Sequence, residues 1–376
     1  MAERKPMRNP AWHIAVLLAL LLLSASQRLG AQDIPERFKV GMSYRTFHPQ
    51  EPYNWRGAQT HALGAVVWYP VRPTATEQPL VIPGMSNIFV LGSVVQDARI
   101  ATASAKFPLI MLSHGTGGSA LSMAWIGEAL AARGYIVTGV NHPGNNATEA
   151  YTAQGFSTWW ERAKDLSVGI DAMLADATFG SHIDARSIGA TGFSLGGYTM
   201  IEIAGGISEP AAFRQFCTSP QADNICKSPP EFPTLLEDFD RLSKTDPEFQ
   251  AALKHAADSY RDPRVRAVFA MAPALGPAFP RAGLAKISIP VEIVAGAADT
   301  NVPVQSSAKY FAANIPGATF TIFPGNVGHY TFLDSCPDSA RKTRALFCSD
   351  GPGVDRDAVH EKTAQLAAAF FTAALK

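Results

Sequence analysis

The sequence predicts an α/β protein in which a mostly parallel sheet is covered by helices on both faces. Between residues 109 and 323, short apolar runs alternate with segments of helical character. The apolar runs are continuous, which is typical of strands that are buried on both faces of a parallel sheet. The chain has 376 residues, 47% of them hydrophobic, and can therefore bury a core of this size.

The first elements are two β-prone runs, residues 38–47 and 62–69, separated by a turn at residues 54–57. We expect them to pair antiparallel at one edge of the sheet. Residues 71–106 show no clear pattern. The remaining strands are expected at residues 109–112, 135–140, 188–193, 265–271, 291–295 and 319–323, and the helices at 120–133, 159–176 and 356–375.

An insertion at residues 206–262 interrupts the alternation and contains two amphipathic helix candidates. One spans residues 231–242, and the other begins at Asp246 and Pro247, an N-cap followed by a proline at the first helical position. The insertion comes before the strand at residues 265–271, which places it at the carboxyl edge of the sheet, where ligands bind. We expect a helical cap over the site; the alternative is a helical excursion packed on the flank of the sheet.

Residues 1–31 have the composition of a secretory signal peptide. Three basic residues precede an apolar run at residues 14–23, and small residues at 24–26 and 29–31 offer cleavage sites. The alternative is a signal anchor, but the apolar run is short for a membrane span. We therefore expect a secreted or periplasmic protein, residues 32–376, without a stable membrane span.

Charge and cysteine content exclude several classes of function. Lys plus Arg equals Asp plus Glu at 32 each, and the absence of long basic runs argues against nucleic-acid binding. The spacing of the four cysteines fits no common metal site, and neither a metal nor another cofactor is expected. In an oxidising compartment, the preferred pairings among three possibilities are Cys217–Cys226 and Cys336–Cys348.

The candidate nucleophile is Ser194, at the centre of a G-x-S-x-G sequence that follows a short apolar run. This pattern is typical of a strand that turns sharply into a helix with the serine at the corner. The glycines Gly192 and Gly196 allow strand and helix to approach closely, and the helix directs free N–H groups at an anion beside the serine. The alternative is an ordinary serine in a tight turn.

A serine hydroxyl needs a base that is itself oriented by a carboxylate. In this arrangement the chain order is serine, acid, histidine. Asp299 follows the strand at residues 291–295, and His329 lies in a glycine-containing loop after the last strand. Because parallel strands bring their carboxyl ends together, both residues can reach Ser194. Asp334 is a weaker alternative to Asp299.

The sequence His-Gly-Thr-Gly-Gly at residues 114–118 predicts an oxyanion hole. The two backbone N–H donors are assigned to Thr116 and to Leu195, which follows the nucleophile. The alternative is a glycine-rich turn between a strand and a helix without a catalytic role.

Six short segments resemble α/β-hydrolases of the dienelactone hydrolase-like group, which also contains platelet-activating-factor acetylhydrolases. They are residues 67–70 (VWYP), 112–115 (LSHG), 141–144 (NHPG), 192–197 (GFSLGG), 296–299 (GAAD) and 328–329 (GH). The resemblance spans roughly residues 38–330 and implies an α/β-hydrolase fold. True dienelactone hydrolases use a cysteine nucleophile where this chain has Ser194, so the resemblance implies serine ester hydrolysis rather than lactone specificity.

The leading hypothesis is a secreted carboxylic-ester hydrolase in which Ser194 forms an acyl-enzyme, His329 is the general base and acid, and Asp299 orients His329. The expected substrate is a small-molecule or lipid-like ester. An acyltransferase using the same acyl-enzyme and a non-catalytic binding module on this fold are the alternatives, and amide hydrolysis is a less favoured reaction. The sequence specifies neither the acyl and alcohol groups nor the oligomeric state.

Overall fold

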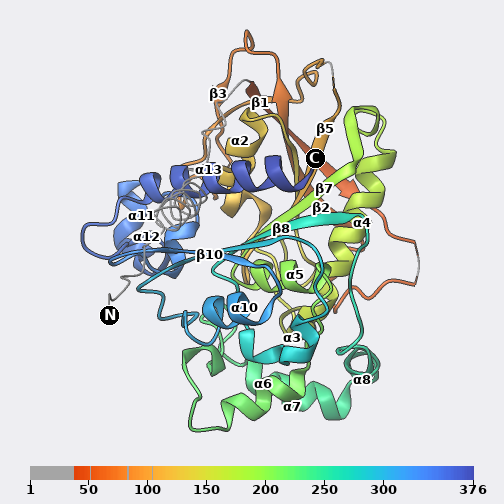
Figure 1. Ribbon diagram of the computed structural model, residues 1–376, viewed down its shortest axis with the longest axis vertical. Coiled ribbons are helices and arrows are strands. Elements are labelled where there is room, and N and C mark those ends of the chain that lie inside the picture. The colour runs from red at the N-terminus through yellow and green to blue at the C-terminus, as the bar shows by residue number, and fades with distance from the viewer. Residues whose placement is uncertain (1–37, 51, 83, 104) are drawn as a thin grey trace, which may run out of the picture.

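The computed structural model describes residues 38–376 except 51, 83 and 104. The expected signal peptide, residues 1–31, lies outside the described residues. The described chain forms a ten-stranded sheet in the order β10-β9-β8-β7-β5-β6-β2-β1-β4-β3 (Figure 1). Strands β5 to β10 are mutually parallel, so the predicted fold class is confirmed.

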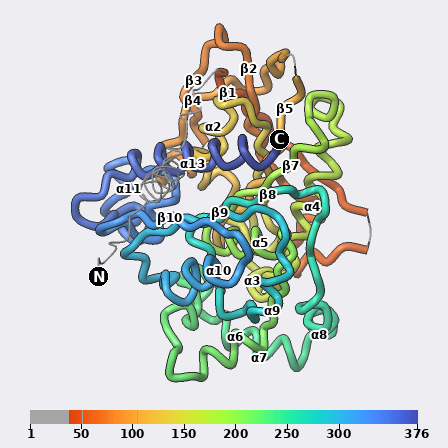
Figure 2. Tube along the Cα trace, in the orientation of Figure 1, coloured from red at the N-terminus to blue at the C-terminus, as the bar shows by residue number. Residues whose placement is uncertain are grey.

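The parallel strands match the expected positions closely, because each is a continuous buried apolar run. They are β5 (Phe107–Ser113), β6 (Ile136–Val140), β7 (Ile183–Phe193), β8 (Val265–Met271), β9 (Val291–Gly296) and β10 (Thr319–Phe323). Strand β7 is longer than expected at its amino end. In the Cα trace, β7 to β10 cross the centre of the molecule in sequence order (Figure 2).

The two amino-terminal strands, β1 (Lys39–Phe47) and β2 (Leu63–Val71), pair antiparallel as expected. Strand β2 continues through Pro70, where the sequence suggested an end. Strand β6 pairs with β2 only as far as Trp68, so Pro70 has a strand partner on one side alone, where a missing N–H is tolerated.

Residues 71–106, which gave no pattern, add a short outer edge to the sheet. Strand β4 (Ser93–Gln96) runs parallel to β1, and β3 (Gln78–Pro79) pairs antiparallel with β4. Both strands are too short to show a period in the sequence.

Helices cover both faces of the sheet and bury one hydrophobic cluster on each. Helices α2 (Ala124–Ala132) and α13 (Arg356–Ala374) contact each other on one face. Helices α4 (Arg162–Ala175) and α5 (Leu195–Ile203) contact each other on the opposite face. Shorter helices complete the fold: α3 (Ala153–Ser157), α9 (Arg281–Leu284), α10 (Ala308–Asn314), α11 (Asp338–Thr343) and α12 (Ala345–Cys348).

The insertion at residues 206–262 is helical and contains α6 (Pro210–Cys217), α7 (Leu235–Thr245) and α8 (Pro247–Lys254), which gather at one end of the molecule (Figure 1). Helix α7 begins four residues later than the expected 231, because Pro233 disfavours helical backbone at the residue before it. Helix α8 begins as expected, with the Asp246 carboxylate accepting a hydrogen bond from the Phe249 N–H at 2.9 Å.

The two preferred disulfides, Cys217–Cys226 and Cys336–Cys348, are present. The first lies within the insertion, and the second links the segment that follows His329 to the end of α12. Among the described residues, none of the helices has both the length and the apolar character required to cross a membrane.

Candidate active site

Ser194 occupies the turn between β7 and α5 in a strained backbone conformation. Its φ of 57° and ψ of −116° are sparsely populated for a non-glycine residue. Neighbouring backbone holds this conformation, since the Ser194 N–H donates to the Met271 carbonyl at 2.9 Å and the Ser194 carbonyl accepts from the Ala274 N–H at 3.0 Å. The serine side chain is therefore positioned by β8 and the residues that follow it.

The glycines on either side of Ser194 have no room for a side chain. A Cβ at Gly192 would lie 2.5 Å from the Gly196 carbonyl oxygen, and a Cβ at Gly196 would lie 2.0 Å from that of Ser113. Since both obstacles are backbone atoms, any substitution would separate β7, α5 and β5. This explains the G-x-S-x-G spacing through steric packing.

The structure brings Ser194, His329 and Asp299 together in one hydrogen-bonded line. The Ser194 Oγ lies 2.9 Å from His329 Nε2, and His329 Nδ1 lies 2.7 Å from Asp299 Oδ2. All three side chains are buried. The arrangement follows from the adjacent positions of β7, β8, β9 and β10, whose carboxyl ends meet at one edge of the sheet.

The Asp299 carboxylate is fixed by its own loop. Its Oδ1 accepts hydrogen bonds from the N–H groups of Asn301 at 3.1 Å and Val302 at 2.8 Å, which leaves Oδ2 for His329. The imidazole also packs against the Phe193 ring, with centroids 4.7 Å apart. The His329 imidazole is thus oriented by the Asp299 carboxylate and by the Phe193 ring without a bound ligand.

Asp334, the alternative acid, has a different set of partners. Its two carboxylate oxygens accept from the N–H groups of Ala124 and Trp125, each at 3.0 Å, at the start of α2. Burial raises the pKa of Asp334 to about 7, while the two N–H donors and Arg356 act in the opposite direction. Asp334 therefore caps a helix and does not contact His329.

The loop predicted to form the oxyanion hole follows β5 directly. Among the described residues, the Thr116 and Leu195 N–H groups have no hydrogen-bond partner, and both residues line the cavity that contains Ser194. The neighbouring Gly117 N–H is occupied, because it donates to Asn145 Oδ1 at 2.8 Å. Two free amides beside the serine can donate hydrogen bonds to an oxygen that develops negative charge.

A buried polar network behind this loop was not predicted from the sequence. The Arg162 guanidinium donates to the His114 carbonyl oxygen and lies 3.4 Å from Asn145 Oδ1. His142 Nε2 lies 2.8 Å from Ser113 Oγ, and its Nδ1 lies 2.6 Å from Asp165 Oδ2. The network fixes the loop from the side opposite the cavity.

The same network contains a buried ion pair. Arg56 Nη2 donates to both carboxylate oxygens of Asp165, at 2.8 and 2.7 Å. Burial opposes ionisation of Asp165, yet Arg56 and His142 hold its pKa at about 2. Burial and the charge of Arg162 lower the pKa of His142 to about 3, which keeps its imidazole neutral. Two sequence features contain members of this network: His142 belongs to the segment at residues 141–144, and Arg56 to the turn at 54–57. Neither feature indicates that both side chains contact Asp165.

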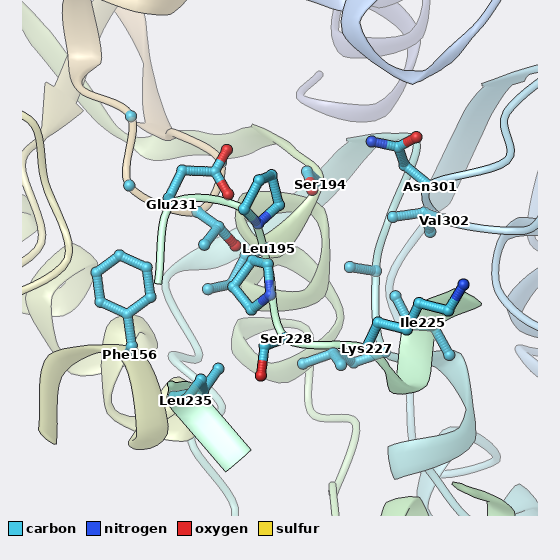
Figure 3. Close-up of a pocket in the computed structure, with 18 of the residues that line it drawn as sticks. Phe156, Ser194, Leu195, Ile225, Lys227, Ser228, Glu231, Leu235, Asn301 and Val302 are labelled. Atoms are coloured by element: carbon cyan, nitrogen blue, oxygen red, sulfur yellow. The ribbon is translucent and has the colours of Figure 1, made fainter. Parts of the chain in front are cut away.

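A cavity of about 880 Å³ opens onto Ser194 and His329. Much of its wall comes from the insertion, and Figure 3 shows Ile225, Lys227, Ser228, Glu231 and Leu235 around it. Most of the other lining side chains are apolar or aromatic, including Met85, Ile88, Phe89, Tyr151, Phe156, Trp159, Phe213, Phe239, Val302, Tyr330 and Phe347. A cavity of this size and character suits a largely apolar organic ligand. Within the described residues, no group of three or more His, Cys, Asp or Glu side chains is arranged to hold a metal ion.

The strand order and the serine at the β7–α5 turn define an α/β-hydrolase fold. The family model described as "Serine aminopeptidase, S33" matches residues 105–335, more than half of the chain. The chain therefore belongs to this family of α/β-hydrolases.

Similar proteins include several ester hydrolases. The chain is 34% identical over 83 residues to "Lipase 1" of Moraxella sp. (strain TA144), covering 22% of this chain and 23% of the lipase. It is 32% identical over 97 residues to "Cutinase est1" of Thermobifida alba, covering 25% of this chain and 29% of the cutinase. The chain thus matches less than a third of the length of either relative.

A solved structure of a ferulic acid esterase from Streptomyces cinnamoneus extends the similarity to the whole fold. Its TM-score is 0.59 at 21% identity, and the match covers 90% of this chain and 91% of the esterase. At this identity the likeness demonstrates the shared fold.

Proposed function

We propose that this chain is a secreted serine hydrolase of carboxylic esters, with Ser194 as nucleophile. The observation that carries the proposal is the hydrogen-bonded line from Ser194 Oγ through His329 to Asp299, at the base of an apolar cavity. The local similarity to a lipase and a cutinase supports esters as the substrate class. The two disulfides and the composition of residues 1–31 support export.

The geometry supports acyl transfer in two steps. Ser194 Oγ attacks the ester carbonyl carbon while His329 Nε2 takes the hydroxyl proton, and Asp299 stabilises the imidazolium that forms. The carbonyl oxygen becomes an oxyanion that accepts hydrogen bonds from the Thr116 and Leu195 N–H groups. The alcohol then leaves with the proton from His329, and water hydrolyses the acyl-enzyme through the same base.

Three other reactions or roles are distinguished by specific observations. An acyltransferase would use the same acyl-enzyme, and product analysis with added alcohol separates it from a hydrolase. Amide hydrolysis is less favoured because an amine is a poorer leaving group than an alcohol. A non-catalytic binding module would be favoured by a missing catalytic group, whereas Ser194, His329 and Asp299 are all present and hydrogen-bonded.

Two finer assignments belong to the same proposal. We infer that the insertion at residues 206–262 is a cap, because Phe213, Glu231 and Leu235 from this segment line the cavity with Ser194. The dienelactone hydrolase-like subgroup rests on the six motifs, of which residues 192–197, 296–299 and 328–329 contain the three hydrogen-bonded side chains.

The test is a panel of p-nitrophenyl esters of increasing acyl length, measured with the wild type and with Ser194→Ala. We expect the wild type to hydrolyse the panel and to be labelled by a fluorophosphonate probe. Ser194→Ala should lose the labelling and most of the turnover, leaving a residual rate of about 10³–10⁴ over water. Labelling of Ser194→Ala, or hydrolysis by this variant at close to the wild-type rate, would refute Ser194 as the nucleophile.

A further inference from the structure

The charged side chains that line the cavity differ in their exposure. Among the described Lys, Arg, Asp and Glu residues of the lining, Arg214, Lys227 and Asp240 are exposed, whereas Glu231 is half-buried. Most of the remaining wall is apolar. Glu231 therefore introduces a half-buried carboxylate into a mostly apolar cavity.

Glu231 packs directly on the loop that supplies the oxyanion-hole amide of Thr116. A Cβ placed on Gly117 would lie 3.1 Å from both Cβ and Cγ of Glu231. In the view of Figure 3, Glu231 and Ser194 lie towards one end of the cavity, with Lys227 and Leu235 towards the other. Glu231 thus lies in the part of the cavity that contains Ser194.

No cation or phenol of the described protein pairs with this carboxylate. The Tyr151 hydroxyl, which is close to Glu231, donates instead to the Gly117 carbonyl at 2.7 Å. The hydrogen bond available to the Glu231 carboxylate comes from its own backbone N–H. Burial raises the pKa of Glu231, while its own backbone N–H and the nearby His329 act in the opposite direction.

Two tyrosines, Tyr151 and Tyr330, line the cavity near the same position. The charge of Glu231 acts on the phenols of Tyr151 and Tyr330, raising the pKa of each in addition to the effect of burial. The Tyr151 ring also packs against Phe156, with centroids 5.0 Å apart. Aromatic faces together with one unpaired carboxylate attract an organic ammonium group, because ring quadrupole and carboxylate both favour positive charge.

We propose that Glu231 makes this site selective for esters that carry an organic ammonium group close to the scissile bond. The proposal rests on the function proposed above and names its substrate class. The ligand cation compensates the partly desolvated carboxylate and contacts the tyrosine rings, while the ester carbonyl reaches Ser194. An anionic group at the same position is repelled.

The test compares two esters of the same acid: the choline ester and the 3,3-dimethylbutyl ester, which replaces the quaternary nitrogen by carbon. We expect wild-type kcat/KM to favour the choline ester. Glu231→Gln should reduce this preference by about 10-fold or more, because the attraction between the quaternary ammonium and a partly buried carboxylate is lost. The matched control is Glu237→Gln. Glu237 is an exposed residue of α7 that does not line the cavity, so this equal change of charge should retain the preference.

A second measurement does not depend on a variant that folds. Choline should inhibit wild-type hydrolysis of a p-nitrophenyl ester more strongly than 3,3-dimethylbutanol does. An equal wild-type kcat/KM for the two esters, an unchanged preference in Glu231→Gln, or equal inhibition by the two alcohols would overturn the proposal. The p-nitrophenyl ester assay distinguishes the two failures. If only the selectivity is wrong, the wild type still hydrolyses these esters in a Ser194-dependent manner; if the proposed function is wrong, it does not.

Discussion

At the scale of single residues, the two aspartates considered as the acid that orients His329 have separate partners. Asp299 bonds the imidazole, whereas Asp334 accepts from the first N–H groups of α2. A carboxylate at a helix start stabilises the helix by satisfying free donors and by interacting with its dipole. Substituting each aspartate should therefore affect a different property.

We expect Asp299→Asn to reduce kcat by about 10⁴, because the amide favours the wrong tautomer of His329. Asp334→Asn should leave kcat within a few-fold and lower the free energy of unfolding by about 1 kcal/mol, since one acceptor of the cap is lost. Turnover of a p-nitrophenyl ester and urea denaturation of both variants measure these effects. The reverse pattern, with Asp334→Asn inactive and Asp299→Asn active, would show the acid assignment to be wrong.

At the scale of elements, the loop at residues 114–118 depends on side chains from outside β5. Asn145 accepts from the Gly117 N–H at 2.8 Å, and Arg162 contacts the His114 carbonyl from α4. Asn145 is a positioning residue, because it holds the loop without lining the cavity around Ser194.

Asn145→Ala should lower kcat by about 10- to 100-fold with a smaller change in KM, since the oxyanion forms only in the transition state. Asn145→Asp keeps an acceptor for the Gly117 N–H and should recover part of kcat. Steady-state kinetics of both variants test this, with melting temperatures as the check on folding. Equal losses of kcat in the two variants would argue against a positioning role.

The disulfide Cys336–Cys348 lies beside the segment that carries His329. Tyr330 packs against Phe347, with centroids 5.4 Å apart, and both residues line the cavity. The bridge therefore ties α12 to the wall of the site. We expect the double change Cys336→Ser/Cys348→Ser to lower turnover more strongly than it lowers stability, with a stability loss of about 2–4 kcal/mol at most.

Turnover and melting temperature of this double variant, compared with Cys217→Ser/Cys226→Ser, provide the measurement. The second pair joins two parts of the insertion; its cysteines also line the cavity, but the bridge lies outside the segment that carries His329. Normal turnover together with a large drop in melting temperature would mean that the Cys336–Cys348 bridge has no role in positioning His329.

At the scale of the whole molecule, buried histidines make stability dependent on pH. His360 donates to the Thr331 carbonyl at 2.8 Å and stacks on Trp125, and burial lowers its pKa from 6.5 to about 4. Because the folded state holds the neutral form, its contribution is complete above pH 6.5 and is lost as the pH falls towards 4. The shift corresponds to about 3 kcal/mol.

We therefore expect His360 to lower the melting temperature of the wild type between pH 6.5 and 4, against Asp334 and Glu202, whose raised pKa values favour the folded state as the pH falls. His360→Gln can still donate to Thr331, and its melting temperature should fall less over the same range, although it starts lower. Thermal unfolding monitored by circular dichroism at several pH values tests this. Parallel curves for the two proteins would show that His360 does not contribute to the acid limb.

The sequence alone determined where the parallel strands lie along the chain and which side chains are candidates for the site. Continuous apolar runs define β5 to β10 because a strand buried on both faces needs apolar residues throughout. Ser194 was evident because the glycines beside it obey a steric requirement that is local in the chain. Asp299 and His329 followed from their positions at strand ends, since the carboxyl ends of parallel strands meet.

Only the tertiary structure decided which polar side chains share a partner. Asp165 meets Arg56 across 109 positions and Asp334 meets Trp125 across 209, and no local pattern encodes such pairs. The contact of Glu231 with Gly117, in the loop at residues 114–118, likewise joins segments far apart in the sequence. Hydrophobic periodicity records which face of an element is buried, whereas a hydrogen bond depends on the position of two atoms that folding alone brings together.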